Sequence, residues 1–231
     1  MLELFPEGFE EVAAGDDVEL VAYTDSGGEE RMWHAFGGAR SADIAADWRD
    51  RWKAFHRPVR IGSLWIGPPW AEPPAEVTPV VIEPARAFGT GAHPTTQLCV
   101  ELLLRLERGS LLDLGCGSGV LSIVAAKLGF APVLAFDADE HAVAATRANA
   151  SSNDADVEAA VGDVLNLDLP RTDIAVANIT RPTLEALAPR LRVRWLVSSG
   201  YLPTDETQLD VFRHVRRIAR DSWAADLYEA A

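Results

Sequence analysis

The chain has 231 residues, 48% of them hydrophobic, and its 35 acidic residues against 21 lysines and arginines give a net charge of −14. A chain of this length can bury one sizeable core and carry a small additional unit. The surplus of carboxylates repels phosphate backbones, so nucleic acid is not expected as a direct partner. The same charge favours a cationic substrate such as a lysine-rich protein, although solubility alone also explains it.

Membrane insertion, secretion and metal chemistry find no support in the sequence. No apolar run approaches the roughly 20 residues that span a bilayer, and the amino terminus MLELFPEGFEEV is acidic where a secretory signal is cationic. We therefore expect a soluble, cytoplasmic and monomeric protein. Cys99 and Cys116 lack the spacing of a redox pair or a zinc site, and the five histidines are scattered. We expect two reduced, buried thiols and no metal.

The first 79 residues indicate two small parts. Residues 18–24 and 31–36 resemble strands on either side of the turn-forming DSGG, which predicts a hairpin. Residues 41–56 have an apolar face and a possible N-cap at Ser41, which predicts a helix. The proline-rich and glycine-rich stretch that follows indicates a linker with short strands. We therefore divide the chain into a small N-terminal unit (1–40), a linker helix with short strands (41–79) and a main domain (80–231).

From residue 80 onward, short apolar strands alternate with amphipathic helices, which predicts an α/β fold with a parallel sheet covered on both faces. The predicted strands cover residues 111–114, 133–136, 157–161, 173–177 and 195–199, and the predicted helices cover residues 94–107, 120–128, 140–149, 182–191 and 205–212. The tail, residues 214–230, has no clear period. A helix and an antiparallel pair of strands both remain open there.

The glycine loop DLGCGSG, residues 113–119, ends a predicted strand and opens a helix, where backbone N–H groups can approach a ligand. A dinucleotide fingerprint needs G-x-G-x-x-G, but the third glycine, Gly119, comes one residue early. The loop also carries Asp113, whose carboxylate would oppose a pyrophosphate and attract an ammonium or sulfonium group. S-adenosylmethionine is such a ligand.

Three further polar residues follow predicted strands. Asp137 can accept hydrogen bonds from both ribose hydroxyls of an adenosine ligand, with a helix cap as the alternative role. Asp163 can accept a bond from an adenine amino group, or it is simply a turn residue. The amide oxygen of Asn178 can accept a hydrogen bond from an amine, with a turn-forming role as its alternative.

Together with the uncharged stretch AFGTGAHPTTQ, residues 87–97, these pieces resemble a known family. AFGTGAHPTTQLCVELL, LLDLGCGSGVLSIVAAKLG, FDADEHAVAATRANA, VGDVL, VANIT and LVSSGYL occur in the order and spacing of the ribosomal protein L11 methyltransferase (PrmA) family. The resemblance covers about residue 47 to the C-terminus. It implies a class I, Rossmann-like methyltransferase fold with a mainly parallel seven-stranded sheet, an antiparallel hairpin at its tail, and a small, reduced N-terminal α+β unit.

The resemblance also implies the residues of the site. Thr96, Gly115, Asp137 and Asn178 match the family's cofactor-binding positions, and the motif at 87–97 would fold over the cofactor with Pro94 or Thr95 starting a helix. We assign His93 a structural role in preference to that of a base. The complete set expected to bind S-adenosylmethionine is Phe88, Gly89, Thr90, Thr96, Asp113, Gly115, Gly117, Asp137, Asp163 and Asn178.

The implied activity is methyl transfer to amines of a protein, with lysines and the N-terminal amine of ribosomal protein L11 as the expected acceptors. Asn178 is the expected catalytic residue, because its amide can orient an amine lone pair without taking the proton. The chain departs from the family in a shorter N-terminal region and in Thr180 and Tyr201, which we expect to line the acceptor site. Another protein lysine or a small amine is the alternative substrate.

Two other classes of protein remain as rivals. A nicotinamide oxidoreductase is disfavoured by the early third glycine and by the lack of a candidate proton donor. A cofactor-binding protein without catalytic activity is favoured by the short N-terminal region and disfavoured by the intact Asn178.

Overall fold

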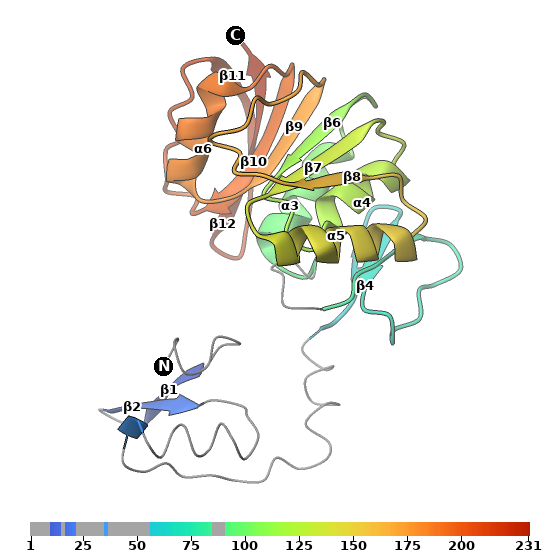
Figure 1. The fold of residues 1–231 in the computed structure, drawn as a ribbon, viewed down its shortest axis with the longest axis vertical. Helices are drawn as coiled ribbons and strands as arrows, with labels where there is room; N and C mark the ends of the chain where they lie inside the picture. The colour runs from blue at the N-terminus through green and yellow to red at the C-terminus, as the bar shows by residue number, and fades with distance from the viewer. Residues whose placement is uncertain (1–9, 15–16, 22–34, 37–55, 85–90) are drawn as a thin grey trace. The chain divides into compact units, whose positions relative to one another are not determined.

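The computed structural model describes residues 10–14, 17–21, 35–36, 56–84 and 91–231 (Figure 1). The chain divides into two compact units, residues 1–52 and residues 53–231. In the first unit, β1 (Glu10–Ala14) pairs antiparallel with β2 (Asp17–Val21). The strand near 18–24 therefore pairs with the chain before it, and Ala35 and Phe36, predicted as the end of a strand, are helical, whereas residues 31–34 of the predicted hairpin lie outside the described residues. The predicted helix over 41–56 lies outside the described residues, apart from His56.

The second unit begins with a small three-stranded sheet. Strands β3 (Val59–Ile61) and β4 (Leu64–Gly67) are antiparallel, and β4 is parallel to β5 (Thr78–Val81). The predicted short strands are confirmed. Leu64, Ile66 and Val80 are at most 1% exposed and belong to the main hydrophobic core, so that burial of their side chains holds this sheet against the rest of the unit.

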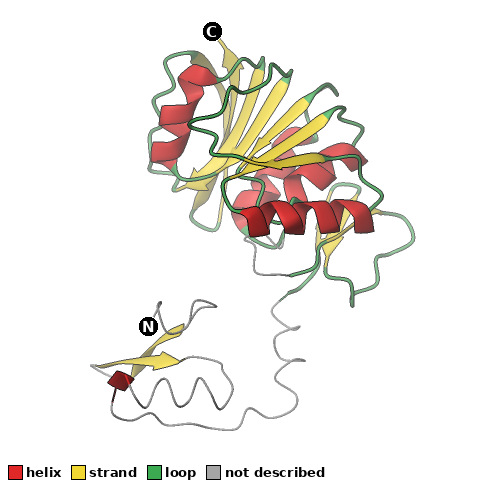
Figure 2. Ribbon diagram, viewed as in Figure 1, coloured by secondary structure: helices red, strands yellow, loops and turns green. Residues whose placement is uncertain are grey.

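A seven-stranded sheet forms the centre of the second unit, in the order β11-β12-β10-β9-β6-β7-β8 (Figures 1 and 2). Its parallel strands are β6 (Leu111–Leu114), β7 (Val133–Asp137), β8 (Glu158–Val161), β9 (Ile174–Asn178) and β10 (Trp195–Tyr201). Strands β11 (Phe212–Arg220) and β12 (Trp223–Ala230) form an antiparallel hairpin beside β10. The expected class I fold and the hairpin are confirmed.

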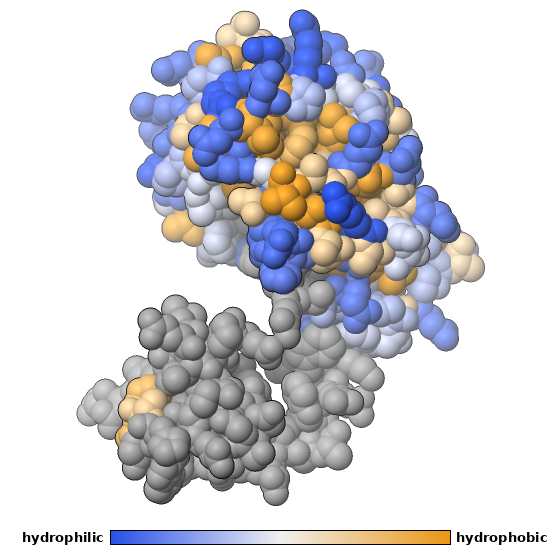
Figure 3. Space-filling model, viewed as in Figure 1, coloured by the Kyte–Doolittle hydropathy of each residue, from blue (hydrophilic) through white to orange (hydrophobic). Residues whose placement is uncertain are grey.

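Helices cover the two faces of this sheet unequally. Helix α3 (Pro94–Leu103) and helix α4 (Val120–Lys127) pack with the small sheet in one core cluster, and α5 (Glu140–Ser152) packs beside them against β7 and β8. On the other face lie α6 (Arg181–Leu187) and the short 3-10 helix η1 (Ala188–Arg190). Figure 3 shows apolar side chains gathered on the face over β8 and the chain after it, where Val161 and Leu165 are exposed.

The predicted helix over 205–212 is wrong, because residues 202–211 form a loop. Leu209 and Phe212 are buried three residues apart, which imitates the spacing of a helix. The Asp205 carboxylate accepts a hydrogen bond from the Leu202 N–H at 2.9 Å. The Arg217 guanidinium donates to the Pro203 and Asp205 carbonyl oxygens at 2.8 and 3.0 Å. These side chains supply the partners that a helix would otherwise provide.

A buried carboxylate joins this loop to the hairpin. Asp226 on β12 is fully buried, and it accepts hydrogen bonds from Arg217, from His214 and from the Tyr201 hydroxyl, each at 2.8 to 2.9 Å. Burial alone would raise the pKa of Asp226, but these donors lower it below its usual value. The carboxylate therefore stabilises the fold above its unfolded pKa of about 3.8, and the contribution is lost as the pH falls below that value.

We predict that Asp226→Asn lowers the free energy of unfolding by roughly 2–3 kcal/mol at pH 7, because the substitution removes a charged hydrogen-bond acceptor from a buried site. Urea unfolding measures this loss. The control is Glu229→Gln on the same strand, since Glu229 pairs with the exposed Arg213 and Arg194, and a loss below about 1 kcal/mol is expected there. Equal losses in the two variants would contradict the prediction.

Candidate functional site

The candidate site lies at the carboxyl ends of β6, β7 and β9, where a parallel sheet with helices on both faces ordinarily binds its ligand. The glycine loop leaves β6 there and turns into α4. Gly115, Gly117 and Gly119 all have positive φ, at 79°, 55° and 81°. A Cβ atom on Gly115 would lie 2.7 Å from the Ile179 side chain, so only glycine lets the loop pass this close to the end of β9.

Asp113 lies beneath the loop and is 1% exposed. Its Oδ2 accepts a hydrogen bond from the Ser122 hydroxyl at 2.5 Å. Its Oδ1 has no partner, and among the described residues it is the only buried side-chain nitrogen or oxygen in that state. Burial raises the pKa of Asp113 to about 6, and the nearby charge of Asp137 adds to the effect. A buried oxygen without a donor is suited to a cationic ligand group.

Asp137 is tied to the glycine loop. Its Oδ2 accepts a hydrogen bond from the Gly117 N–H at 2.9 Å, and its Oδ1 accepts one from the Asp139 N–H at 3.0 Å. The side chain that caps α5 is Asp139, which accepts from the His141 N–H, so the helix-cap alternative for Asp137 is wrong. Each carboxylate oxygen can accept a second bond, which leaves Asp137 able to meet ribose hydroxyls.

Asp163 and residues 88–90 are further residues predicted to bind the cofactor. Asp163 follows β8 and is exposed, and its carboxylate accepts bonds from the Leu165 N–H and the Asn166 amide, as a turn residue does. A contact between Asp163 and adenine stays a prediction. Phe88, Gly89 and Thr90 lie outside the described residues.

Asn178, the last residue of β9, faces the beginning of α3. Its Nδ2 lies 3.1 Å from Thr95 Oγ1 and 3.5 Å from Thr96 Oγ1, and both threonines are buried. His93 is the N-cap of α3, and its Nδ1 lies 2.7 Å from Thr95 Oγ1 and accepts from the Thr95 N–H at 3.4 Å. Thr95 is thus a site residue that the sequence analysis missed. The only sequence signal for it is its place between a proline and the predicted Thr96.

These contacts determine the orientation of the Asn178 amide. In the tautomer whose Nδ1 accepts from the Thr95 N–H, the Thr95 hydroxyl donates its hydrogen to that nitrogen. Thr95 Oγ1 then offers only lone pairs to Asn178, which must meet them with its NH₂ group. The Asn178 Oδ1 is left as an acceptor that no described residue occupies, at the carboxyl edge of the sheet.

A family model for ribosomal protein L11 methyltransferases (PrmA) matches residues 24–223. The chain belongs to this family. Proteins named ribosomal protein L11 methyltransferase are 43% identical over 183 residues in Geotalea uraniireducens and 39% identical over 191 residues in Escherichia coli O9:H4. These matches cover 69% and 78% of this chain. They cover 58% and 63% of those proteins, so the chain spans about three fifths of their length.

A solved structure supports the same family. The crystal structure of the ribosomal protein L11 methylase from Lactobacillus delbrueckii subsp. bulgaricus superposes with a TM-score of 0.69 at 25% identity, and the match covers 76% of this chain and 99% of that one. A putative RNA methyltransferase from Pyrococcus horikoshii, with a TM-score of 0.50 at 20% identity, shares the fold. The PrmA-family fold therefore extends beyond the motifs that carry the sequence resemblance.

The two departures from the PrmA motifs, Thr180 and Tyr201, differ in their exposure to solvent. Gly200 has a φ of +107°, and a Cβ atom there would lie 2.2 Å from the Ile179 carbonyl oxygen. The strand is irregular between Ser199 and Tyr201, and Tyr201 turns into the core cluster beside α6, where it is 3% exposed and donates to Asp226. The expectation that Tyr201 lines the acceptor site with Asn178 is wrong. Thr180 is exposed just beyond β9.

The cysteines, possible metal ligands and helix lengths of this PrmA-family chain bear on its remaining chemistry. Cys99 and Cys116 are free and buried as expected, and burial raises the pKa of the Cys116 thiol to about 12. The described residues contain no group of three or more potential metal ligands. In the same part of the chain, no helix has both the length and the apolar character needed to cross a membrane.

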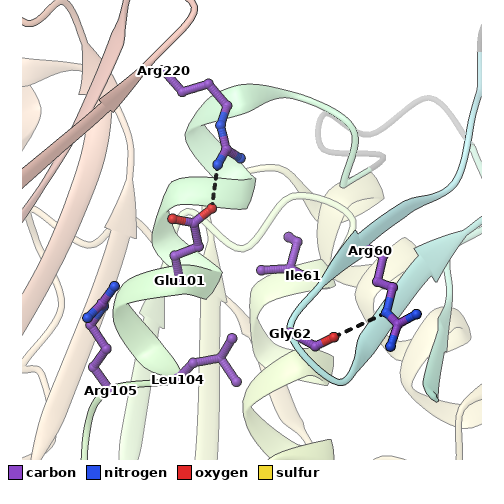
Figure 4. A pocket seen from close by; sticks show the side chains of 7 residues that line it. All are labelled: Arg60, Ile61, Gly62, Glu101, Leu104, Arg105 and Arg220. Atoms are coloured by element: carbon purple, nitrogen blue, oxygen red, sulfur yellow. Dashed lines mark hydrogen bonds and ion pairs between the residues drawn. The ribbon is translucent and has the colours of Figure 1, made fainter. Parts of the chain in front are cut away.

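A cavity of about 350 Å³ lies away from these residues, between the β3–β4 turn, α3 and the tip of the hairpin (Figure 4). Figure 4 shows the Arg220 guanidinium directed at the Glu101 carboxylate, 2.7 Å away, while Arg60 is turned toward the Gly62 carbonyl oxygen. None of the predicted site residues lines this cavity. Its polar groups hold α3 against the hairpin, so we assign it a role in packing.

We predict that Asp113→Asn stabilises the protein without ligand at neutral pH. The folded pKa of about 6 lies above the unfolded value of 3.8, so the wild type loses stability as the pH rises through this interval. The variant should be up to roughly 3 kcal/mol more stable at pH 8, with a smaller difference at pH 5. Urea unfolding of both proteins at the two pH values measures the difference. A stability difference that does not change with pH would contradict the raised pKa of Asp113.

Proposed function

We propose that this chain is an S-adenosylmethionine-dependent protein N-methyltransferase of class I that methylates lysine and N-terminal amines of ribosomal protein L11. The observation that carries the proposal is the buried Asp113 oxygen without a partner beneath the glycine loop, because it suits a ligand with a positive charge. Membership of the PrmA family and the names of its relatives support the reaction and the substrate.

The residues present fit this cofactor. Asp113 would meet its ammonium group, Asp137 its ribose hydroxyls, and the glycine loop would provide close backbone contact. S-adenosylmethionine supplies an electrophilic methyl group on a sulfonium. Thr96 and the segment with Phe88, Gly89 and Thr90 would enclose the cofactor.

The chain's own contribution to the reaction is alignment. Asn178 Oδ1, held outward by the Thr95 contact, would accept a hydrogen bond from the acceptor amine and direct its lone pair toward the methyl group. An amide does not take up a proton, so the amine must arrive neutral or lose its proton to water. The pKa of a lysine amine is about 10.4 and that of an α-amine about 7.7–8.0, so a site that disfavours charge would assist both.

The substrate and the organisation of the chain belong to the same proposal. Thr180 and Ile179 follow Asn178 in place of an aromatic clamp for a planar group, which favours a flexible aliphatic amine. The division into a substrate-recognition unit (1–40), a linker region (41–79) and a methyltransferase domain (80–231) stays part of the proposal, as do a cytoplasmic, monomeric protein and the absence of a nucleic-acid partner. Methylation of another protein lysine or a small amine is the alternative.

We predict that the chain binds S-adenosylhomocysteine, the demethylated product of the cofactor, and does not bind NAD. Titration calorimetry at pH 8 measures both. Asp113→Asn should weaken S-adenosylhomocysteine binding by about tenfold or more, because a buried ion pair is lost while the fold is stabilised. A wild-type chain that does not bind S-adenosylhomocysteine, or that binds NAD more tightly, would overturn the proposal.

We predict that Asn178→Ala lowers the rate of methyl transfer to purified ribosomal protein L11 on the order of 100-fold, because the acceptor amine loses its alignment. Transfer of a labelled methyl group from the cofactor measures the rate. Ser152→Ala serves as the control, since the Ser152 hydroxyl bonds the Ala148 carbonyl oxygen on the exposed side of α5, and its rate should stay near that of the wild type. No transfer by the wild type to L11, together with transfer to another amine, would leave only the alternative substrate.

A further inference from the structure

One face of α5 carries three buried polar side chains that the proposed mechanism does not use. Thr146, Asn149 and Asn153 are spaced three and four residues apart, so they lie in a row along the helix. They are between 0% and 6% exposed. Burying such groups costs free energy unless they are hydrogen-bonded. Each of them is bonded to a partner outside the helix, and the partners fall into two groups.

Asn153 bonds the small sheet. Its Oδ1 accepts from the Val81 N–H at 2.8 Å, and its Nδ2 donates to the Val81 carbonyl oxygen at 2.6 Å and to the Asn149 carbonyl oxygen at 2.7 Å. The side chain therefore takes the place of a neighbouring strand at the edge of β5. It makes no hydrogen bond to the glycine loop.

Thr146 bonds only the glycine loop. Its hydroxyl lies 3.0 Å from the Gly117 carbonyl oxygen and 3.3 Å from the Cys116 sulfur. Its side chain also fills the space beside Gly119, where a Cβ atom would come within 2.8 Å. Thr146 thus holds the loop in shape without reaching the small sheet.

Asn149 makes hydrogen bonds to both segments, the end of the small sheet and the glycine loop. Its Oδ1 accepts from the Glu83 N–H at 3.1 Å, where the chain leaves β5, and its Nδ2 donates to the Ser118 carbonyl oxygen at 2.9 Å in the glycine loop. One planar amide therefore joins the two segments.

We infer that Asn149 is a positioning residue for cofactor binding, which holds the glycine loop in register with the end of β5. The inference rests on the proposed function and adds the means by which β5 and the glycine loop, which are distant in the sequence, are held together beside the cofactor site. Because a single rigid amide carries both bonds, a ligand that orders the loop also orders the end of β5. The end of β5 is then coupled to the glycine loop through the Asn149 amide.

Affinity for S-adenosylhomocysteine tests the inference. Asn149→Ala should weaken binding by about tenfold or more, whereas Asn153→Ala should change it by less than about twofold, although both lower the melting temperature of the unliganded protein. The isosteric Asn149→Asp keeps the acceptor for Glu83, loses the donor to Ser118, and should show the same loss. Equal affinity changes in Asn149→Ala and Asn153→Ala would overturn the inference, because support of the fold alone would then account for both.

Hydrogen exchange of the wild type tests the coupling without any variant. Adding S-adenosylhomocysteine should slow amide exchange at residues 113–119 and also at 78–84, and in Asn149→Asp only the first effect should remain. Protection confined to 113–119 in the wild type would overturn the inference while leaving the proposed function intact. Failure of the wild type to bind S-adenosylhomocysteine at all would instead count against the proposed function.

Discussion

The site depends on one unfavourable burial, that of the Asp113 carboxylate at the end of β6. Ser122 satisfies one of its oxygens, and the other is buried without a hydrogen-bond donor. Such a group raises the free energy of the unliganded fold, and a cationic ligand reverses that effect. The glycine loop above it allows a ligand close to the backbone, so that stability and binding oppose each other at this residue.

The loop is supported by elements that are distant in the sequence. Ile179 from the end of β9 packs against Gly115, and Gly200 on β10 gives room to the Ile179 backbone. Thr146 and Asn149 on α5 hold the loop's carbonyl oxygens. Because these contacts come from the ends of β9 and β10 and from a helix, the position of the loop is a property of the whole second unit.

Sequence periodicity was most informative where one element is buried by its neighbours. The strand predicted at 111–114 and the start of the helix at 120 agree with β6 and α4, since apolar runs beside glycine turns have few alternatives in a parallel sheet. The helix predicted over 205–212 failed because Arg217, fixed by Asp226 on another strand, satisfies the backbone of that loop. A local pattern carries no information about such a partner.

The sequence by itself determined the alternation of strands and helices from α3 to β10, the glycine loop, and the candidate residues Asp113, Asp137 and Asn178, because motif spacing and residue chemistry are local properties. Only the tertiary structure decided which way side chains face. An irregularity at Gly200 turns Tyr201 into the core cluster beside α6. The N-cap histidine of α3 orients the Asn178 amide through Thr95. Both results depend on contacts between segments far apart in the chain, which no window of sequence contains.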